Sequence, residues 1–270
     1  MRLSNIRKSI GFVHWLDKLG ASSLHFFHEA GALSILLART VYALLSGRLR
    51  WAHVLDQMNK IGVTSFPLVC MTSLFTGMVL ALQSAYQLRY FQAVPVTADL
   101  VGLSVTRELG PVLTAMVVAG RVGAGITAEL GTMKVTEQID ALSSLGVDPI
   151  RYLVVPRFLA SFVMLFILAI YADFIGIFGG YVVGVLKLDI ASHLYVKRTV
   201  EAMVFKDIYT GLIKAFFFGV IIATVGCYHG LNAGGGAEGV GRATTMSVVT
   251  SLILIIAFDC FFTAVFYFMF

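Results

Sequence analysis

The feature that most constrains this chain is an uninterrupted run of 28 uncharged residues, 61–88. Coiled as a helix that rises about 1.5 Å per residue, this run exceeds the roughly 30 Å hydrocarbon core of a bilayer. Four further apolar stretches long enough to cross follow it, at residues 98–128, 158–186, 208–228 and 243–269. The sequence therefore predicts an all-α integral membrane protein with five transmembrane helices.

The composition supports a membrane environment. Only 13% of the residues are charged and 58% are hydrophobic, whereas soluble domains carry roughly 25% charged residues. Such a chain has too little polar surface to cover a water-soluble globule. No compact apolar core with a small-residue cleavage site follows the basic start, so we expect the spans themselves to direct insertion.

The N-terminal part differs from the rest in charge. The first 60 residues hold eight basic and three acidic residues, which accounts for the whole net charge of +5. Residues 5–28 have the pattern of a basic amphipathic helix, which suits the membrane interface. Residues 31–46 are short for a crossing and contain Arg39, so we expect an interfacial or re-entrant segment there. The expected organisation is an interfacial segment, 1–50, followed by a five-span domain, 51–270.

Charge also predicts orientation and partners. A basic N-terminus favours the cytoplasmic side, and five spans then place the C-terminus outside. Because the basic residues alternate with apolar ones beside a membrane domain, we expect no binding of nucleic acid.

The most polar internal segment lies between the second and third spans. Its hydrophobic residues recur at helical spacing, which predicts a short amphipathic helix over 132–145 on the cytoplasmic side. Gly146 is suited to end this helix, and Asp148-Pro149 to begin the next one. The helix is either an interfacial connector or a docking element for a soluble partner.

Arg107 and Glu108 lie within the second predicted span. Ionisable groups at membrane depth cost several kcal/mol unless they are paired or hydrated. Pro111 lacks the N–H that would bond to the Arg107 carbonyl, which loosens the helix at this point. These residues either line a substrate path or lie among the lipid headgroups at a helix start.

Two further patterns indicate helix packing. Arg121 and Glu129 are eight residues apart and share a broad helix face, so we expect a structural pair. Gly176, Gly180 and Gly184 recur every four residues, which is typical of a stripe where helices approach closely. The pattern does not distinguish contact within the chain from contact between copies.

Asp173 and Asp259 are single acidic residues in the third and fifth predicted spans. Each is either a proton or substrate site or a structural partner of a basic residue such as Lys214 or Arg242. We favour structural pairing for both.

No catalytic motif is visible in the chain. Gly234-Gly235-Gly236 lies in a predicted polar loop, 231–245, and lacks the following Lys-Ser/Thr of a phosphate loop. No metal-ligand spacing or nucleophile elbow is present. We expect no catalytic residue, metal or cofactor in this chain, and therefore no ATP hydrolysis by it.

Three segments together form a recognisable pattern: GMVLALQ (77–83), the long stretch from TRELGPVL to YLVVPR (106–157) and GRATT (241–245). They resemble the MlaE-type permeases, the membrane subunits of MCE-associated ABC transporters. The resemblance runs from about residue 60 to the C-terminus. It implies a homodimer in the inner, cytoplasmic membrane of a double-membrane bacterium. It also implies a cytoplasmic ATPase dimer that binds ATP and Mg, an outer ring of MCE-domain proteins, and transport of phospholipids or related lipids between the two membranes.

The resemblance also implies roles for individual residues. The helix at 132–145 becomes the coupling helix, with Glu137, Gln138 and Asp140 contacting the ATPase. The residues that match the family's lipid pathway are Leu80, Leu88, Phe91, Arg107, Glu108 and Leu109, with Phe91 standing where relatives often carry tyrosine. Lys214, Arg242 and Asp259 match charged positions of the family.

Three other functions would make different use of the charged residues within the spans. An ion-coupled secondary transporter of a hydrophobic substrate would use Glu108, Asp173 and Asp259 as relay sites. An intramembrane enzyme would need a facing catalytic pair, and a structural scaffold would tolerate loss of the charges. An ATPase partner with lipid-stimulated turnover distinguishes the permease from all three.

Overall fold

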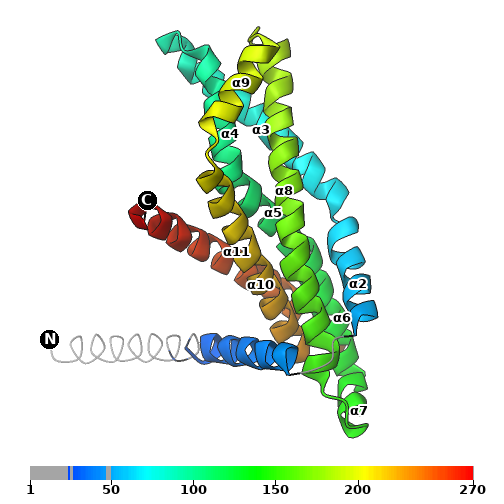
Figure 1. Ribbon diagram of the computed structural model, residues 1–270. Helices are drawn as coiled ribbons and strands as arrows, with labels where there is room; N and C mark the ends of the chain where they lie inside the picture. The colour runs from blue at the N-terminus through cyan, green and yellow to red at the C-terminus, as the bar shows by residue number, and fades with distance from the viewer. Residues whose placement is uncertain (1–23, 25–26, 47–49, 270) are drawn as a thin grey trace, which may run out of the picture.

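A computed structural model describes residue 24 and residues 27–46 and 50–269, and Figure 1 shows the resulting bundle. These residues form helices and no strand. Five helical segments are long and apolar enough to cross a membrane: Trp51–Phe91, Val94–Val135, Ile150–Leu186, Phe205–Leu231 and Gly236–Phe268. The predicted all-α fold with five spans is confirmed. The predicted amphipathic helix at 5–28 lies almost wholly outside the described residues.

A separate helix precedes the spans, over residues 27–45. It lies across the axis of the bundle at the end that carries α7 (Gln138–Ser144), as the blue ribbon in Figure 1 shows. Leu36 and Thr40 are buried against the bundle, whereas Ile35 and Tyr42 are exposed. This one-sided burial is compatible with the predicted interfacial position, and we call residues 27–45 the interfacial helix.

The first two spans contain irregular turns. The first is built from α2 (Trp51–Met58), the π-helical turn η1 (Asn59–Val63) and α3 (Phe66–Leu88), and it ends in the 3₁₀ turn η2 (Arg89–Phe91). After the 3₁₀ turn η3 (Val94–Val96), the second comprises α4 (Thr97–Ser104), η4 (Val105–Leu109), α5 (Gly110–Val118), η5 (Ala119–Gly123) and α6 (Ala124–Val135). Like η1, η4 and η5 are π-helical turns, which occur mostly as single bulges and often at functional sites.

The remaining spans are longer and more regular. The π-helical turn η6 (Ile150–Val154) leads into α8 (Val155–Leu186), and α9 (Ser192–Ala202) connects α8 to α10 (Phe205–Leu231). The last span is α11 (Gly236–Met269). We predicted a polar loop over 231–245, and this was wrong. The turn is short because Gly235 and Gly236 adopt positive φ angles of 83° and 72°, and the GRATT residues are helical.

The centre of the bundle is α8, which packs most extensively on α3 and α10. A Cβ atom on Gly77 of α3 would lie 1.8 Å from the Gly176 carbonyl oxygen, so the two backbones are in direct contact. Gly180 and Gly184 leave room in the same way for Tyr195 of α9. The predicted glycine stripe is therefore a packing stripe within the chain.

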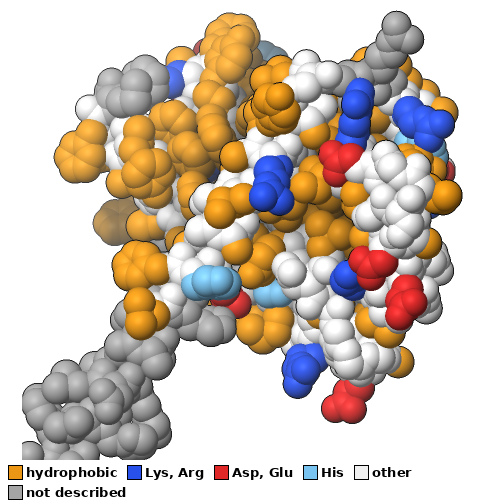
Figure 2. Space-filling model, turned by 90° about the horizontal axis from the view of Figure 1, so that it is seen from below, with side chains coloured by type: hydrophobic (Ala, Val, Ile, Leu, Met, Phe, Trp, Pro, Cys, Tyr) orange, Lys and Arg blue, Asp and Glu red, His pale blue; other side chains and the backbone are white. Residues whose placement is uncertain are grey.

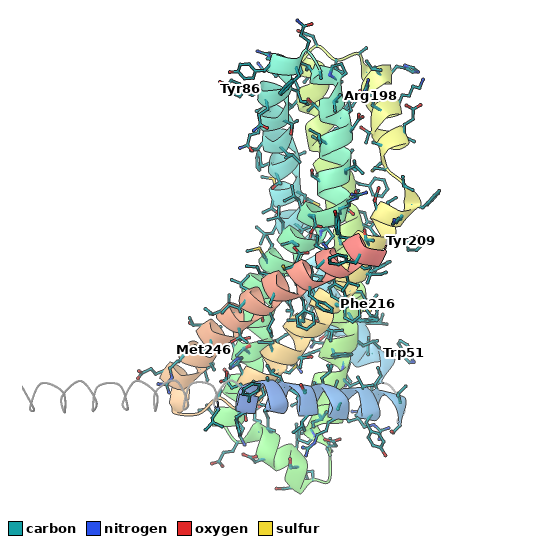
Figure 3. The ribbon with its side chains drawn as sticks, turned by 90° about the vertical axis from the view of Figure 1, so that its left-hand side faces the viewer. Trp51, Tyr86, Arg198, Tyr209, Phe216 and Met246 are labelled. Atoms are coloured by element: carbon teal, nitrogen blue, oxygen red, sulfur yellow. The ribbon has the colours of Figure 1, made fainter. Side chains whose placement is uncertain are left out.

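The end of the bundle opposite α7 is tied by α9. Arg198 of α9 donates to Asp99 of α4, with 3.1 Å between Nη1 and Oδ2. The Tyr195 side chain is buried between these elements, and burial raises the pKa of its phenol above the ordinary range. In Figure 3, Tyr86 and Arg198 mark this end and Trp51 marks the other, beside the interfacial helix. Aromatic and basic side chains at both ends fit the two membrane interfaces.

The last span is the least covered. Only 11% of the apolar window in Gly236–Phe268 is buried, against 61% in Ile150–Leu186. Figure 3 shows this helix running obliquely past the others. Its outer side chains, including Ile253, Ile256 and Phe261, are exposed and suited to hydrocarbon.

The polar segment between spans two and three differs from its predicted bounds. We expected one helix over 132–145, but α6 continues to Val135 and α7 covers only Gln138–Ser144. Glu137 between them has a left-handed backbone with φ of 61°, which sets α7 at an angle to α6. Gly146 ends α7 with φ of 76°, as predicted. Asp148 accepts the Ile150 N–H at 3.0 Å and so caps the next helical turn.

Candidate functional site

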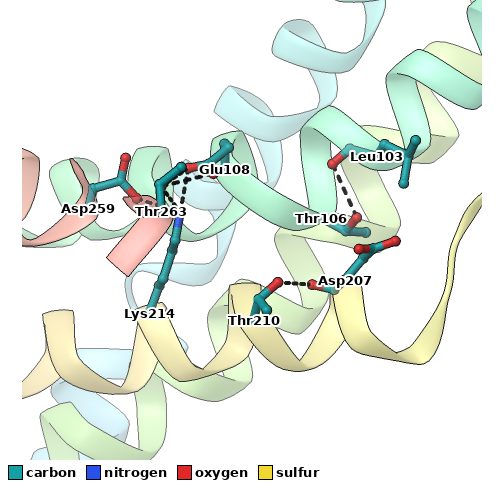
Figure 4. Close-up of polar contacts among 8 residues, drawn as sticks. All are labelled: Leu103, Thr106, Glu108, Asp207, Thr210, Lys214, Asp259 and Thr263. Carbon is teal, nitrogen blue, oxygen red and sulfur yellow. Dashed lines mark hydrogen bonds and ion pairs between the residues drawn. The ribbon is translucent and has the colours of Figure 1, made fainter. Parts of the chain in front are cut away.

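The most unusual group within the spans is the ammonium of Lys214 on α10, whose residue is only 1% exposed. It donates to Glu108 Oε2 at 2.5 Å and to Thr263 Oγ1 at 2.7 Å, and it lies 2.9 Å from Asp259 Oδ1 as an ion pair. Thr263 in turn donates to Glu108 Oε1 at 3.1 Å. Figure 4 shows these four side chains converging from three elements, and we call them the Lys214 cluster.

The composition of the Lys214 cluster follows from the cost of burying charge. An ammonium removed from water is stabilised only when carboxylates and hydroxyls replace its lost hydration. Asp259 and Thr263 are four residues apart on α11 and therefore share one face. With two carboxylates to one ammonium, the cluster carries a formal net charge of −1. The prediction that Asp259 pairs with a basic residue is confirmed.

A second ion pair lies beside the cluster. Arg107 of η4 donates through Nε to Asp207 Oδ1 at 2.7 Å, and its Nη2 lies 2.6 Å from the same oxygen. The Asp207 side chain is buried, and its Oδ2 also accepts the Val204 N–H at the start of α10. The Arg107 side chain remains half-exposed, so one of the two partners faces open space.

The backbone of η4 positions both Arg107 and Glu108. The π-helical turn covers Val105–Leu109, directly before the proline at 111, where we expected a loosened helix. Gly211 of α10 packs on this turn, since a Cβ atom there would lie 2.0 Å from the Thr106 carbonyl oxygen. This close approach brings α10 near enough for Lys214 to reach Glu108.

These charged groups line an open cavity of about 510 Å³. Its wall consists of basic, acidic, hydroxyl and aromatic side chains: Arg107, Glu108, Lys206, Asp207, Thr210, Lys214, Thr263, Phe266 and Tyr267. A cavity lined by both charged side chains and apolar aromatic rings can bind a molecule that has a charged group and a hydrophobic part.

Asp173 lies on the other side of η4 and is not part of the Lys214 cluster. A Cβ atom on Gly110 would lie 1.8 Å from Asp173 Oδ1, so the glycine leaves room for this carboxylate. The residue is buried beside a small apolar cavity of about 90 Å³, and within the described part of the chain Oδ1 has no hydrogen-bond partner. Our prediction that it pairs with Lys214 or Arg242 was wrong, because α8 points it toward η4.

The predicted Arg121–Glu129 pair was also wrong. The Arg121 guanidinium donates to the Thr64 carbonyl and to the Ser65 hydroxyl, at the start of α3. Glu129 instead pairs with Arg157 of α8, whose Nη2 lies 2.7 Å from Glu129 Oε2. Helical spacing places the two residues on one face of the second span, but the side chain of each one bonds to a different neighbouring segment.

The structure separates the remaining predicted lipid-pathway residues from the charged cavity. Leu80 packs in the small core around Val101 and Val183, and Leu109 lies on the opposite side of η4. Phe91 is exposed in η2, and neither it nor Leu88 lines the 510 Å³ cavity. Arg242 is exposed on α11 and does not reach the cluster.

The predicted coupling residues lie together on α7 and in the turn before it. Glu137, Gln138 and Asp140 are all exposed, whereas Ile139 is buried in the main core. Asp140 accepts from Lys134 of α6, with both carboxylate oxygens within 3.0 Å of Nζ. The helix therefore presents a polar edge to the outside while Ile139 and this ion pair hold it to α6.

Comparison with known proteins identifies the family. Residues 54–265 match the family model described as Permease MlaE. The chain belongs to the MlaE permease family. A probable ABC transporter permease protein of Rickettsia felis is 44% identical over 93% of this chain and 97% of the relative. The intermembrane phospholipid transport system permease protein MlaE of Haemophilus influenzae is 36% identical over 94% of this chain and 97% of the relative. A probable ABC transporter permease protein of Synechocystis is 43% identical over 85% and 88%.

As a member of the MlaE permease family, the chain is a multi-pass membrane permease. Sequence reasoning had found Lys214, Asp259 and Glu108 but missed two of their neighbours, Thr263 and Asp207, and also missed Arg157, the partner of Glu129. Thr263 could have been found from its position four residues after Asp259 on one helix face. Asp207 lies in the first turn of α10, where an acidic residue is ordinarily explained by its favourable interaction with the helix N-terminus. No sequence pattern indicated a role for Arg157, because its burial depends on how α8 packs against the other helices.

Proposed function

We propose that this MlaE-family permease moves phospholipids or related lipids between the inner and outer membranes of a double-membrane bacterium. A separate ATPase subunit supplies the energy. The observation that carries the proposal is the buried Lys214 ammonium, shared between two carboxylates beside a cavity that is also lined by aromatic side chains. The printed function of the Haemophilus relative, intermembrane phospholipid transport, supports the choice of substrate.

The Lys214 cluster offers a means of binding a phosphate without leaving the buried ammonium unpaired. In the empty site the carboxylates of Glu108 and Asp259 neutralise the ammonium. An entering phosphate can replace one carboxylate, and the guanidinium of Arg107 is half-exposed beside it. Phe266 and Tyr267 then border the apolar part of the lipid. Because Lys214 exchanges one anionic partner for another and is never left unpaired, release of the headgroup also costs little free energy.

Energy reaches this site through the helix that connects the second and third spans. In the proposed mechanism, closure of an ATPase dimer on ATP and Mg pushes α7, with Glu137, Gln138 and Asp140 as contacts. The push passes along α6 and α8, and the spans of two copies of this chain close the cavity. The lipid leaves toward a ring of MCE-domain proteins on the outer side.

The test is reconstitution of the purified chain with its ATPase subunit in vesicles that contain a labelled phospholipid. We expect ATP-dependent removal of the lipid that is abolished by vanadate and insensitive to a protonophore. A Glu137→Lys, Gln138→Lys variant makes the exposed edge more positive while keeping the Lys134–Asp140 ion pair. It should therefore lose ATPase binding while still folding. Transport that needs no ATPase subunit contradicts the proposal.

The second candidate, an ion-coupled transporter, is favoured by one observation. Asp173 is a buried carboxylate without a hydrogen-bond partner on Oδ1 among the described residues, and such groups mark proton relays in some membrane transporters. The same vesicles decide between the two. Transport driven by a proton gradient without ATP, and lost in Asp173→Asn, would establish ion coupling.

A further inference from the structure

A second polar groove lies apart from the Lys214 cluster, where the interfacial helix meets the start of the third span. It has a volume of about 580 Å³. One wall is a single face of the interfacial helix, with Ala38, Arg39, Tyr42, Ala43 and Ser46 at helical spacing. The other wall comes from Asp148, Ile150 and Arg151. Segments more than 100 residues apart in the sequence therefore bring two guanidiniums into one groove.

Neither guanidinium has an acidic partner in the part of the chain that the structure describes. Within the described residues, Arg39 and Arg151 make no ion pair or hydrogen bond, unlike Arg107, Arg157 and Arg198. The one acidic residue of the groove, Asp148, uses Oδ1 to accept the Ile150 N–H. The lining therefore has a formal net charge of +1, with two forked donors that match a phosphate group.

The groove lies at the end of the bundle where the third candidate span begins. The interfacial helix runs across the bundle axis, and the third candidate span begins at Ile150, which is itself in the groove. From below, Figure 2 shows charged side chains spread over this end and apolar side chains gathered on one side of it. Amphipathic helices with basic side chains lie at the interface of bilayers.

The size and chemistry of the groove select its occupant. A water molecule takes about 30 Å³ of liquid volume, so the groove has room for a whole headgroup. The side chains of Ala38 and Ala43 are small and leave space in the groove, and the hydroxyls of Tyr42 and Ser46 add polar groups beside the guanidiniums. Ile150 supplies an apolar surface next to the charges. Basic pockets between helices at a membrane surface bind anionic lipid headgroups.

We propose that this groove is a binding site for the phosphate headgroup of an anionic phospholipid in the leaflet on the α7 side. The bound lipid links the interfacial helix to the beginning of the third span. The site is separate from the Lys214 cluster and does not depend on transport, so failure of one proposal leaves the other standing.

The test is native mass spectrometry of the purified full-length protein, titrated with phosphatidylglycerol or with phosphatidylcholine of the same chains. The Arg39→Gln, Arg151→Gln variant should bind phosphatidylglycerol about tenfold more weakly at one site per chain. Binding of phosphatidylcholine should not change, because the loss concerns net charge. Inorganic phosphate at millimolar concentration should not displace the lipid, because it lacks the apolar contacts.

The matched control removes two basic residues at the opposite end of the bundle. Arg89→Gln, Lys187→Gln makes an equal change in charge at two exposed positions and should retain the site. A second variant, Ala38→Trp, fills the groove from an exposed position while keeping both arginines, and it should lose the same lipid. Circular dichroism and a thermal melt check that each variant is folded.

Three results would overturn the assignment. One is equal loss of phosphatidylglycerol from the double variant and the control. Another is equal loss of the anionic and the zwitterionic lipid, which would mean that no anion is recognised. The third is displacement by inorganic phosphate, which would identify a site for a soluble phosphate.

Discussion

Two buried cations in this chain have opposite surroundings. Lys214 and Arg157 are both almost fully buried, at 1% and 4% exposure, and each has a half-exposed glutamate as partner. Lys214 meets two carboxylates and a hydroxyl from η4 and α11 beside the 510 Å³ cavity. Arg157 meets one carboxylate of α6 and donates at 2.8 Å to the carbonyl of Leu153 in η6, the turn that leads into α8. It does not line that cavity.

This difference in partners distinguishes a cation that can bind a ligand from a structural tie, by which we mean a cation that holds two helices together. A cation with more partners than it needs, next to an open cavity, can release one of them to a ligand at little cost. A cation with one carboxylate and a carbonyl of its own helix has nothing to exchange, since losing either leaves a buried charge unpaired. We therefore propose that Lys214 takes part in lipid binding and that Arg157 holds α6 against α8.

The largest expected effect is that of Lys214→Met. This variant removes charge-assisted hydrogen bonds, which are worth about 1.5–3 kcal/mol each, and it leaves two carboxylates that repel a phosphate. We expect ATP-driven phospholipid transfer, measured per folded molecule, to fall about 100-fold. Lys187→Met, at an exposed lysine at the end of α8, is the matched control. Transfer by Lys214→Met equal to that of the control would remove the cluster from lipid binding.

The next effect tests the close approach that lets Lys214 reach Glu108. In Gly211→Ala the new methyl group would lie 2.0 Å from the Thr106 carbonyl oxygen, so α10 must move away from η4. We expect a loss of about 2–3 kcal/mol in stability and at least a tenfold loss of transfer. Gly120→Ala has open space around the new methyl group and should be neutral or slightly stabilising. Thermal unfolding and the vesicle assay measure both.

A smaller effect is expected when one carboxylate of the cluster is neutralised. Glu108→Gln or Asp259→Asn leaves Lys214 with the other carboxylate, so each should reduce stability by about 1 kcal/mol. The double variant leaves the ammonium without a counter-charge, and we expect a coupling of about 1–3 kcal/mol beyond the sum. A double-mutant cycle in chemical or thermal unfolding measures it. Strict additivity would show that the two carboxylates do not share one cation.

The smallest effect on transfer is expected at the structural tie. Arg157→Met should lower stability by about 1–2 kcal/mol because half-exposed Glu129 loses its partner and α6 its link to α8. Transfer per folded molecule should stay within about twofold, since the residue does not line the cavity. A thermal melt and the vesicle assay, run on the same preparation, separate the two quantities. A selective loss of transfer at unchanged stability would reverse the assignment.

How much of this could be read from the sequence depends on the range of the interaction. The run at residues 61–88 has to span the bilayer, so the number of spans was predictable from length and apolarity alone. Gly146 and Asp148 also behaved as predicted, because capping is decided within a few residues. Charged partners were harder. Arg121 and Glu129 share a helix face, yet each bonds to a different neighbouring helix.

The candidate site was predictable only in part for the same reason. Glu108, Lys214 and Asp259 were found because charges within spans need an explanation. Their convergence depends on Gly211 packing against η4, which no local pattern contains. Asp173 shows the limit most clearly. The sequence offered two cations as partners, but the packing of α8 places it against Gly110.

The most direct measurement asks whether a phospholipid occupies the cavity because of Lys214. A photoreactive benzoylphenylalanine in place of the half-buried Phe266, which lines the cavity, is irradiated in the protein reconstituted with its ATPase subunit. The account predicts a phospholipid adduct that declines during ATP hydrolysis and is strongly reduced in the Lys214→Met background. Equal adduct yields with lysine and with methionine at position 214 would contradict it.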